Sequence, residues 1–479
     1  MTFGRVAFII LLCSAWPIEA QGPAQPPPLP TAPANIPSAG ISITSGDPFQ
    51  GSVASGQATS TPLALSLQDA IDRGLKANLG LLTRETANRS AQAERIRALS
   101  ALLPNVVGSA SETATQIDLA EFGFRFAGFP TVIGPVGFSD VRASASQSIF
   151  DWTAWKNRQS AAQDMKASQL TYQDGRDLVV QAVASAYLLI IADAARVDAT
   201  RTLVATAQTL YERARDQHRA GVSPAIDELR AQVELKTQQQ ALLSQENQLA
   251  KDKLALGRVI GLPSGQVFEV SEKVPFRPLD GLTPEEILRR AYESRADYQS
   301  AMMQVHAAET AKLAAQAQRY PTLALAGDYA DSGVNLANSH GNFTVTGSLK
   351  FNIFDGGRIR ADEMQVDAVI KQRKDELADL QGQIDFQVRS SLLDLKTAAD
   401  QVAVAQDNLN LANQTLIQAR DRFAAGVTDN IEVVQAQDSV ANANQSLISS
   451  IYAHNLAKVS LARAVGGTEN SLKQFMGGK

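Results

Sequence analysis

Ala220-Gly221-Val222-Ser223 and Ala425-Gly426-Val427-Thr428 are two copies of one turn sequence, placed 205 residues apart. Each copy separates two long segments that are rich in Ala, Gln, Ser and Thr and carry sparse Leu and Val, a composition typical of closely packed helices. Glycine is the usual residue where a helix ends in a left-handed conformation. Gly221 and Gly426 therefore predict a reversal between two antiparallel helices in each copy.

The rest of the chain repeats in the same way. Equivalent positions lie 217 residues apart before the strands, 204 apart at the end of the strands and 205 apart beyond them: Ser66 and Thr283, Ala93 and Thr310, Pro104 and Pro321, Ile149-Phe150-Asp151 and Ile353-Phe354-Asp355, Ile226 and Ile431, Gly261 and Gly466. The change of spacing falls in the loop after Pro104, which is longer in the first copy. A period of about 200 residues indicates a duplicated unit and not a short-repeat solenoid.

Each unit predicts the same series of elements. The expected helices are 66–102, 152–220 and 224–260 in the first unit, and 283–319, 358–425 and 428–465 in the second. The expected strands are 105–117 and 138–150, then 322–332 and 342–354. The last strand alternates strictly, with one apolar face formed by Phe343, Val345, Gly347, Leu349, Phe351 and Ile353. Such alternation is typical of a half-buried sheet, or of a barrel with lipid outside and water inside.

The N-terminus carries targeting signals. Residues 1–20 predict a secretory signal peptide, with Arg5, an apolar run and a small residue at Ala20. Lipidation of Cys13 is disfavoured by the large Leu12 before it, but stays open. Residues 21–62 are rich in Pro, Gly and Ser and predict a flexible linker. The expected units that follow are a first repeat over 63–261, a connector over 262–281, a second repeat over 282–467 and a C-terminal tail over 468–479.

Composition excludes several classes of function. The chain has 479 residues, a formal net charge of −5 and one cysteine, Cys13. Nucleic-acid binders normally carry a basic stripe, so no nucleic-acid partner is expected. The four histidines are not paired at metal-ligand spacing, and no HExxH, GxSxG or Walker A pattern occurs. We therefore expect no enzyme, no cofactor and no metal site.

The lengths of the elements limit the architecture. A helix over 152–220 spans roughly 100 Å at about 1.5 Å per residue. Beyond the signal, the most apolar stretch, Val179–Ala195, is interrupted by Gln181, Ser185 and Asp193, so no transmembrane helix is expected. Four strands cannot close a barrel, and open edges are not tolerated in lipid, so a membrane protein of this kind needs several chains. The alternatives are a soluble helical protein with a small sheet, or a non-channel periplasmic coiled-coil scaffold or adaptor.

In the order and spacing of its motifs over residues 65–466, the sequence resembles the TolC family of outer membrane efflux proteins. The motifs are the duplication, Leu103-Pro104 and Tyr320-Pro321 before strands, Phe354-Asp355-Gly356-Gly357-Arg358 at a strand-to-helix junction, and Arg422-Phe423-Ala424-Ala425-Gly426-Val427 at a helical turn.

The resemblance implies a mainly α chain with a small transmembrane β part. It implies a homotrimer in the outer membrane lipid of a Gram-negative bacterium, with a twelve-stranded β-barrel (four strands per chain) and a long periplasmic α-helical barrel. The implied role is the exit duct of a tripartite efflux pump for small molecules such as drugs, or of a type I protein secretion system. The implied partners are a periplasmic adaptor and an inner membrane transporter of the RND, ABC or MFS type.

The resemblance also implies site residues. The two turns would form the tip where the adaptor docks: Ala220, Gly221, Val222, Ser223, Ala425, Gly426, Val427 and Thr428. Acids just past each turn, Asp227 and Glu432, would face the lumen at the periplasmic aperture, with Gln435 where the family often has a second acid. The alternative is that the two carboxylates only stabilise the N-termini of their helices by interacting with the helix dipoles. The family's Tyr–Arg latch has no counterpart, because Phe423 and Thr428 hold those places; Arg422, Arg420, Asp421 and Arg230 are possible substitutes.

Aromatic residues near the strands predict contacts at the membrane. Phe122, Phe124, Phe126 and Phe129 suggest either a cap on the external mouth or an apolar loop at the lipid interface. Trp152 and Trp155 suggest either the inner membrane–water boundary or packing at the junction of barrel and helices.

Overall fold

The computed structural model describes residues 48–123, 128, 130–272, 274–279, 281, 283–425, 427–428 and 430–476. All of them belong to one compact unit, Ile43–Lys479. The predicted signal peptide, Cys13 and residues 21–47 lie outside the described part. The elements in chain order are η1 (Pro48–Gln50), β1 (Leu63–Leu65), α1 (Leu67–Ala77), α2 (Leu79–Ser100), β2 (Asn105–Asp118), β3 (Val132–Phe150), α3 (Trp152–Arg219), α4 (Ala225–Val259), β4 (Phe268–Val270), α5 (Pro284–Ser294), α6 (Ala296–Ala317), β5 (Thr322–Gly333), η2 (Leu336–Asn338), β6 (Ser339–Lys350), α7 (Arg358–Ala424), α8 (Asn430–Val465) and α9 (Thr468–Met476).

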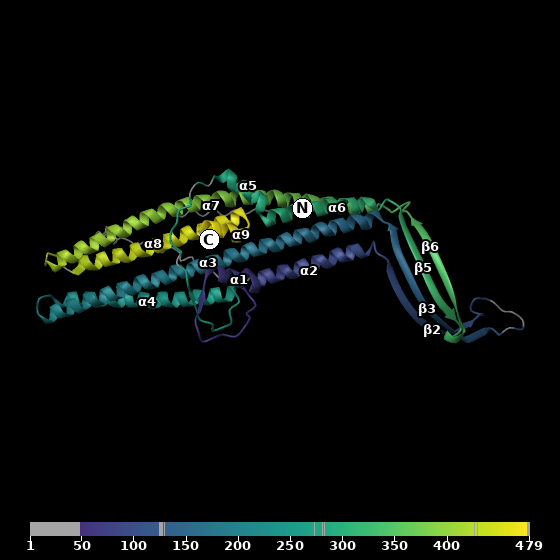
Figure 1. The fold of residues 1–479 in the computed structure, drawn as a ribbon, viewed down its shortest axis with the longest axis horizontal. Coiled ribbons are helices and arrows are strands. Elements are labelled where there is room, and N and C mark those ends of the chain that lie inside the picture. Colours follow the sequence, from purple (N-terminus) through teal and green to yellow (C-terminus); the bar gives the residue numbers. More distant parts are fainter. Residues whose placement is uncertain are drawn as a thin grey trace, which may run out of the picture. The chain divides into compact units, whose positions relative to one another are not determined.

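Two antiparallel helix pairs, α3 with α4 and α7 with α8, form the larger part of this unit (Figure 1). α3 has 68 residues and α7 has 67, so each spans roughly 100 Å. α2 and α6 continue the bundle toward the strands and pack on α3 and α7. The predicted mainly α architecture with a small β part is confirmed.

The strands form one antiparallel sheet with the order β2-β3-β5-β6 at the end of the bundle opposite the α3–α4 and α7–α8 turns (Figure 1). The register places Tyr329 opposite Phe343 and Gly327 opposite Val345, while Thr344 and Thr346 alternate with them on the other face. Almost every residue of β6 is exposed within one chain. The outer strand β6 is therefore exposed on both faces, whereas Ser139 of β3 and Ala330 of β5 are buried. In the described chain β2 and β6 each keep one edge without a partner strand.

The final strand ends earlier than its alternation predicts. β6 stops at Lys350, so Phe351 and Ile353 lie outside it. The reason is its partner: β5 begins at Thr322, which pairs with Lys350, and Pro321 before it has no backbone N–H to extend the ladder. The expected strand over 342–354 was therefore wrong at its C-terminal end.

The two predicted helices 66–102 and 283–319 are each broken, at Asn78 and at Arg295. These positions are 217 residues apart, so the break is part of the duplicated unit. Both residues have extended backbone (ψ 128° and 119°) and link two helices. The Asn78 side chain accepts from the N–H of Gly80 and donates to the carbonyl of Phe49, so tertiary contacts hold the break in place.

Segments expected to be linkers are packed on the bundle. Within the predicted 21–62 linker, Val53 donates to the carbonyl of Ala77 and Ser55 to that of Gly261. β1 pairs in parallel with β4 of the predicted connector. In the predicted tail, Leu472 and Phe475 of α9 are buried. The composition of these segments does not indicate the contacts they make, because propensity from sequence does not include long-range contacts.

Among the described residues, one helix, α3, is long and apolar enough to cross a membrane by length and composition, contrary to the expectation that no such helix exists. Its most apolar window is 61% buried inside the unit. Val179, Val183 and Ile190 are buried there, and the Tyr187 hydroxyl donates to the carbonyl of Leu65 at 2.9 Å. Packing inside the bundle therefore accounts for its apolar character.

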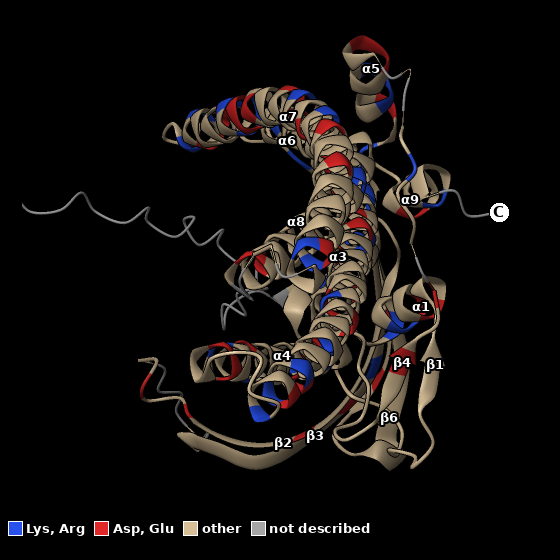
Figure 2. Ribbon diagram, turned by 90° about the vertical axis from the view of Figure 1, so that its left-hand side faces the viewer, with Lys and Arg blue, Asp and Glu red and all other residues tan. Residues whose placement is uncertain are grey.

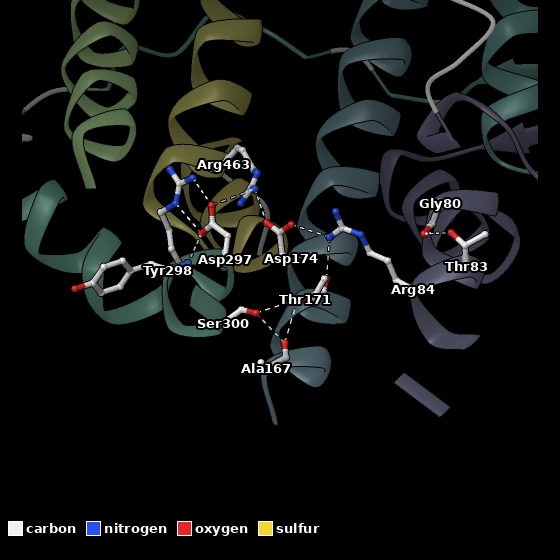
Figure 3. Close-up of polar contacts among 11 residues, drawn as sticks. Gly80, Thr83, Arg84, Ala167, Thr171, Asp174, Asp297, Tyr298, Ser300 and Arg463 are labelled. Atoms are coloured by element: carbon white, nitrogen blue, oxygen red, sulfur yellow. Dashed lines mark hydrogen bonds and ion pairs between the residues drawn. The ribbon is translucent and has the colours of Figure 1, made fainter. Parts of the chain in front are cut away.

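A chain of ions crosses the bundle between the two repeats (Figure 3). Arg84 of α2 contacts Asp174 of α3 at 2.7 Å, and Asp174 contacts Arg463 of α8 at 2.5 Å. Arg463 lies 3.8 Å from Asp297 of α6, which pairs with Arg295 at 2.6 Å. Burial raises the pKa of Asp297, but the hydrogen bonds and charge of Arg295, the charge of Arg463 and the N–H of Tyr298 together outweigh burial, and the pKa falls below its usual value. A buried ion needs such partners, so this row of ion pairs fixes how the two repeats pack.

Gly466 should not tolerate a side chain. It has φ of +89°, and a Cβ there would lie 2.9 Å from the backbone N of Arg295. We expect Gly466→Ala to cost about 1–2 kcal/mol from the left-handed backbone alone, and to lower the thermal unfolding midpoint of the purified protein in detergent.

Gly382 within α7 is the matched control, since nothing lies within 4 Å of its Cβ position. Gly382→Ala should leave the midpoint unchanged or raise it. Equal midpoints for the two variants would contradict the packing described at Gly466.

Asp193 should make stability depend on pH. It lies on α3 against Asp252 of α4, Arg196 of α3 and Tyr452 of α8. Burial, then the hydrogen bond with Asp252, raises the pKa of Asp193 from 3.8 to about 6. The stabilising proton is therefore fully bound below about pH 4 and is lost as the pH rises through about 6.

We expect Asp193→Asn to flatten the decrease of the unfolding midpoint between pH 4 and pH 6.5, measured by circular dichroism. Asp198→Asn, which changes an exposed carboxylate of the same helix, should keep the wild-type slope. If both variants keep it, Asp193 does not titrate in this range.

Candidate functional site

The turn between α3 and α4 is built on Gly221. Its φ is +71°, and no atom lies within 4 Å of its Cβ position. The N–H of Gly221 donates to His218 and that of Val222 to Gln217, the pair of bonds that defines a Schellman cap. Ala220 is the C-cap residue of α3, and Ser223 precedes Pro224, the N-cap residue of α4. The cap leaves the Val222 side chain 77% exposed at the end of the hairpin.

The turn between α7 and α8 repeats one of these two bonds. The N–H of Val427 donates to Arg422 at 3.0 Å, equivalent to the Val222 bond 205 residues earlier. Ala425 is the cap residue, Thr428 is half-buried and Val427 is 68% exposed. Gly426 lies outside the described residues. Both hairpins therefore end in an exposed valine at the same end of the unit (Figure 1).

The two acids predicted at the aperture lie in equivalent first turns but in different surroundings. Asp227 in α4 is 9% exposed, and its Oδ1 lies 3.7 Å from Arg230. Glu432 in α8 is more exposed, and its Oε1 lies 3.5 Å from Arg422. Gln435 follows one turn later and is exposed. From the sequence, Arg230 and Arg422 were candidates for polar pairs at the tip, but their partners were not assigned. The structure pairs each arginine with the acid of its own hairpin.

Charges are interspersed near these turns and along the helices. Figure 2 shows basic and acidic residues alternating along α7, and both kinds on α4. This pattern is typical of solvated helix faces with i,i+3 and i,i+4 pairs. Asp227 and Glu432 fit this pattern, because each has an arginine beside it.

The strand-to-helix junction of the second repeat is organised by Asp355. Its carboxylate accepts from the N–H groups of Gly357 and Ile359, both at 3.0 Å, and these bonds hold the pKa of Asp355 below its usual value. Gly356 and Gly357 have φ of +63° and +88°, which favours glycine. Phe354 just before them is almost fully exposed.

Aromatic residues at the start of α3 are exposed next to cations. Lys156 lies 5.3 Å from the Trp152 ring and Arg158 lies 5.4 Å from the Trp155 ring. Tryptophan beside lysine or arginine is typical of a membrane–water boundary. Phe122 is exposed in the loop after β2, whereas Phe124, Phe126 and Phe129 lie outside the described residues. The roles predicted for these aromatic residues stay predictions.

Comparison with known proteins gives a consistent result. A family model described as outer membrane efflux protein matches residues 70–262 and 287–467. The pyoverdine export outer membrane protein OpmQ of Pseudomonas aeruginosa is 24% identical over 437 residues, covering 87% of this chain and 88% of OpmQ.

Solved structures share the fold. The CmeC outer membrane channel of Campylobacter jejuni matches with a TM-score of 0.74 at 17% identity, covering 90% of this chain and 95% of CmeC. The open state of the MtrE outer membrane channel of Neisseria gonorrhoeae matches with a TM-score of 0.71 at 17% identity, covering 88% of this chain and 95% of MtrE. The resemblance seen in the sequence is confirmed, and the chain belongs to the outer membrane efflux protein family.

Proposed function

We propose that this chain is the outer membrane exit duct of a tripartite efflux pump, which passively exports small molecules such as drugs. In this proposal three copies share one barrel. The sheet carries the proposal, because it has two open edges and an exposed apolar face within one chain.

The energetics of the sheet support several chains in lipid. An apolar face such as that of Phe343, Val345 and Leu349 is costly to leave in water, at about 25 cal/mol per Å². Lipid removes that cost, but it also requires that every backbone group has a partner. Pairing β6 of one copy with β2 of the next satisfies both edges. Three copies then give the twelve strands of a closed barrel.

The helices supply the rest of the duct. At roughly 100 Å, α3 and α7 are long enough to carry a channel well beyond the membrane into the periplasm. In the proposal, the tips at 220–223 and 425–428 receive a periplasmic adaptor. The energy then comes from an inner membrane transporter of the RND, ABC or MFS type.

The function is tested by single-channel recording in planar bilayers on protein extracted from outer membranes, with gel mobility measured before and after heating. We expect an SDS-resistant trimer that conducts ions. A non-conducting monomer in the periplasm would remove the channel proposal and leave a helical scaffold.

Acids at the aperture should attract cations. Six carboxylates from Asp227 and Glu432 of three chains favour cation binding at a constriction. We expect the double variant Asp227→Asn and Glu432→Gln to weaken divalent-cation block of the conductance severalfold in the same recordings. Asp198→Asn, far from the turns, is the control. Block that is unchanged in the double variant would place these acids away from the lumen.

The exposed valines of the tips should bind the adaptor. An acidic group at Val222 and Val427 would have to be desolvated in an apolar contact. We expect Val222→Asp with Val427→Asp to abolish drug resistance in cells while single-channel conductance persists. Val233→Asp changes an equally exposed valine of α4 and should keep resistance. Resistance in the double variant would show that docking does not use these side chains.

A further inference from the structure

A cleft of about 260 Å³ lies between the two hairpins, on the turn side of the bundle. It is bounded by α3 of the first repeat and by α7 and α8 of the second (Figure 1). Its lining residues are Thr206, Thr209, Leu210, Arg213, Arg420, Phe423, Val433 and Gln437. None of the interactions assigned above uses this cleft.

The floor of the cleft is apolar and fixed. Leu210 and Val433 are buried members of the core cluster that joins α3, α4, α7 and α8, and Phe423 packs against that cluster. An apolar group in the cleft would therefore extend an existing core.

The wall of the cleft carries two positive charges and no negative charge. Arg213 comes from α3 and Arg420 from α7, and the eight lining residues include no acid. Nearby arginines are paired, Arg215 with Asp216 and Arg422 with Glu432. Among the described residues, Arg213 and Arg420 have no ion pair. Two guanidinium groups on one cleft favour a planar oxyanion.

Gln437 supplies a hydrogen-bond acceptor that a ligand could satisfy. Its side chain is 4% exposed, and its Oε1 has no hydrogen-bond partner among the described residues. A buried acceptor without a partner is costly, and a ligand that donates a hydrogen bond removes the cost. Three features therefore converge on one ligand: an anion, an apolar body and a hydrogen-bond donor.

We propose that this cleft binds a small organic carboxylate that carries a hydroxyl or N–H group. The carboxylate contacts Arg213 and Arg420, the apolar body lies on Leu210, Phe423 and Val433, and the donor bonds to Gln437. Because the two arginines come from different repeats, the bound anion links the two hairpins. The site lies between helices of one chain, so binding does not require transport.

The test uses isothermal titration of the full-length protein, purified in an uncharged maltoside detergent, with 4-hydroxybenzoate as the probe. We expect saturable binding that weakens as salt is raised. The double variant Arg213→Gln and Arg420→Gln should bind about tenfold more weakly, since two partly solvated ion pairs are lost. Arg360→Gln, an exposed arginine at the start of α7, should bind like the wild type.

The probe itself separates the roles. Benzoate lacks the donor, so it should bind the wild type severalfold more weakly than 4-hydroxybenzoate does. The Gln437→Leu variant should bind the two acids equally well. Any of three results would overturn the proposal. The first is that 4-hydroxybenzoate shows no saturable binding, and the second is that Arg360→Gln weakens binding as much as the double arginine variant does. The third is that the wild type binds the two acids equally well. Single-channel conductance on the same sample reports the duct separately, so a conducting protein that does not bind the probe overturns the anion site alone.

Discussion

The apolar stripe of α3 is the interaction on which the rest of the unit depends. α3 packs against α1, α2, α4, α6, α8 and α9, and thus against elements of both repeats. The buried residues from Val179 to Ile190 remove its most apolar segment from water. A helix of this length has no stable fold in isolation, and most of its stability comes from such packing. Once α3 is fixed, the sheet at one end and the turns at the other are held roughly 100 Å apart.

The duplicated units share a backbone but use it differently. Asn78 and Arg295 break equivalent helices, but Asn78 binds a neighbouring backbone segment, while Arg295 is 2% exposed and belongs to the ion chain of Figure 3. Asp151 caps α3 through the N–H of Ala154 directly, whereas its equivalent Asp355 reaches α7 across two glycines. The two units therefore share one backbone frame, and each half makes its own side-chain contacts.

The cleft between the hairpins shows the same divergence near the turns. The Tyr–Arg pair that the resemblance implies has Phe423 and Thr428 in its place, and Phe423 joins the core cluster instead. Arg422 turns to Glu432, while Arg420 faces the cleft. The cleft thus has Phe423 on its apolar floor and two arginines on its wall that have no ion pair among the described residues, which is the basis of the proposed anion site.

Much of this architecture follows from local patterns. Gly221 and the repeat spacing predicted the reversals, because only a residue that accepts positive φ fits a Schellman cap. Alternation predicted the strands to within a few residues, and the acids were located at equivalent first turns. These features depend on neighbours in the chain, so sequence order carries them.

Other features needed partners that are distant in the sequence. The helix breaks at Asn78 and Arg295, the packing of residues 48–62 and α9, and the end of β6 at Lys350 depend on contacts with other segments. So do the pairing of Arg230 and Arg422 and the buried Gln437 beside two arginines. The sequence alone determined the duplicated helical frame and its four amphipathic strands. Only the tertiary structure decided which charges meet and which stay unpaired, because burial and partnership are properties of the packed chain.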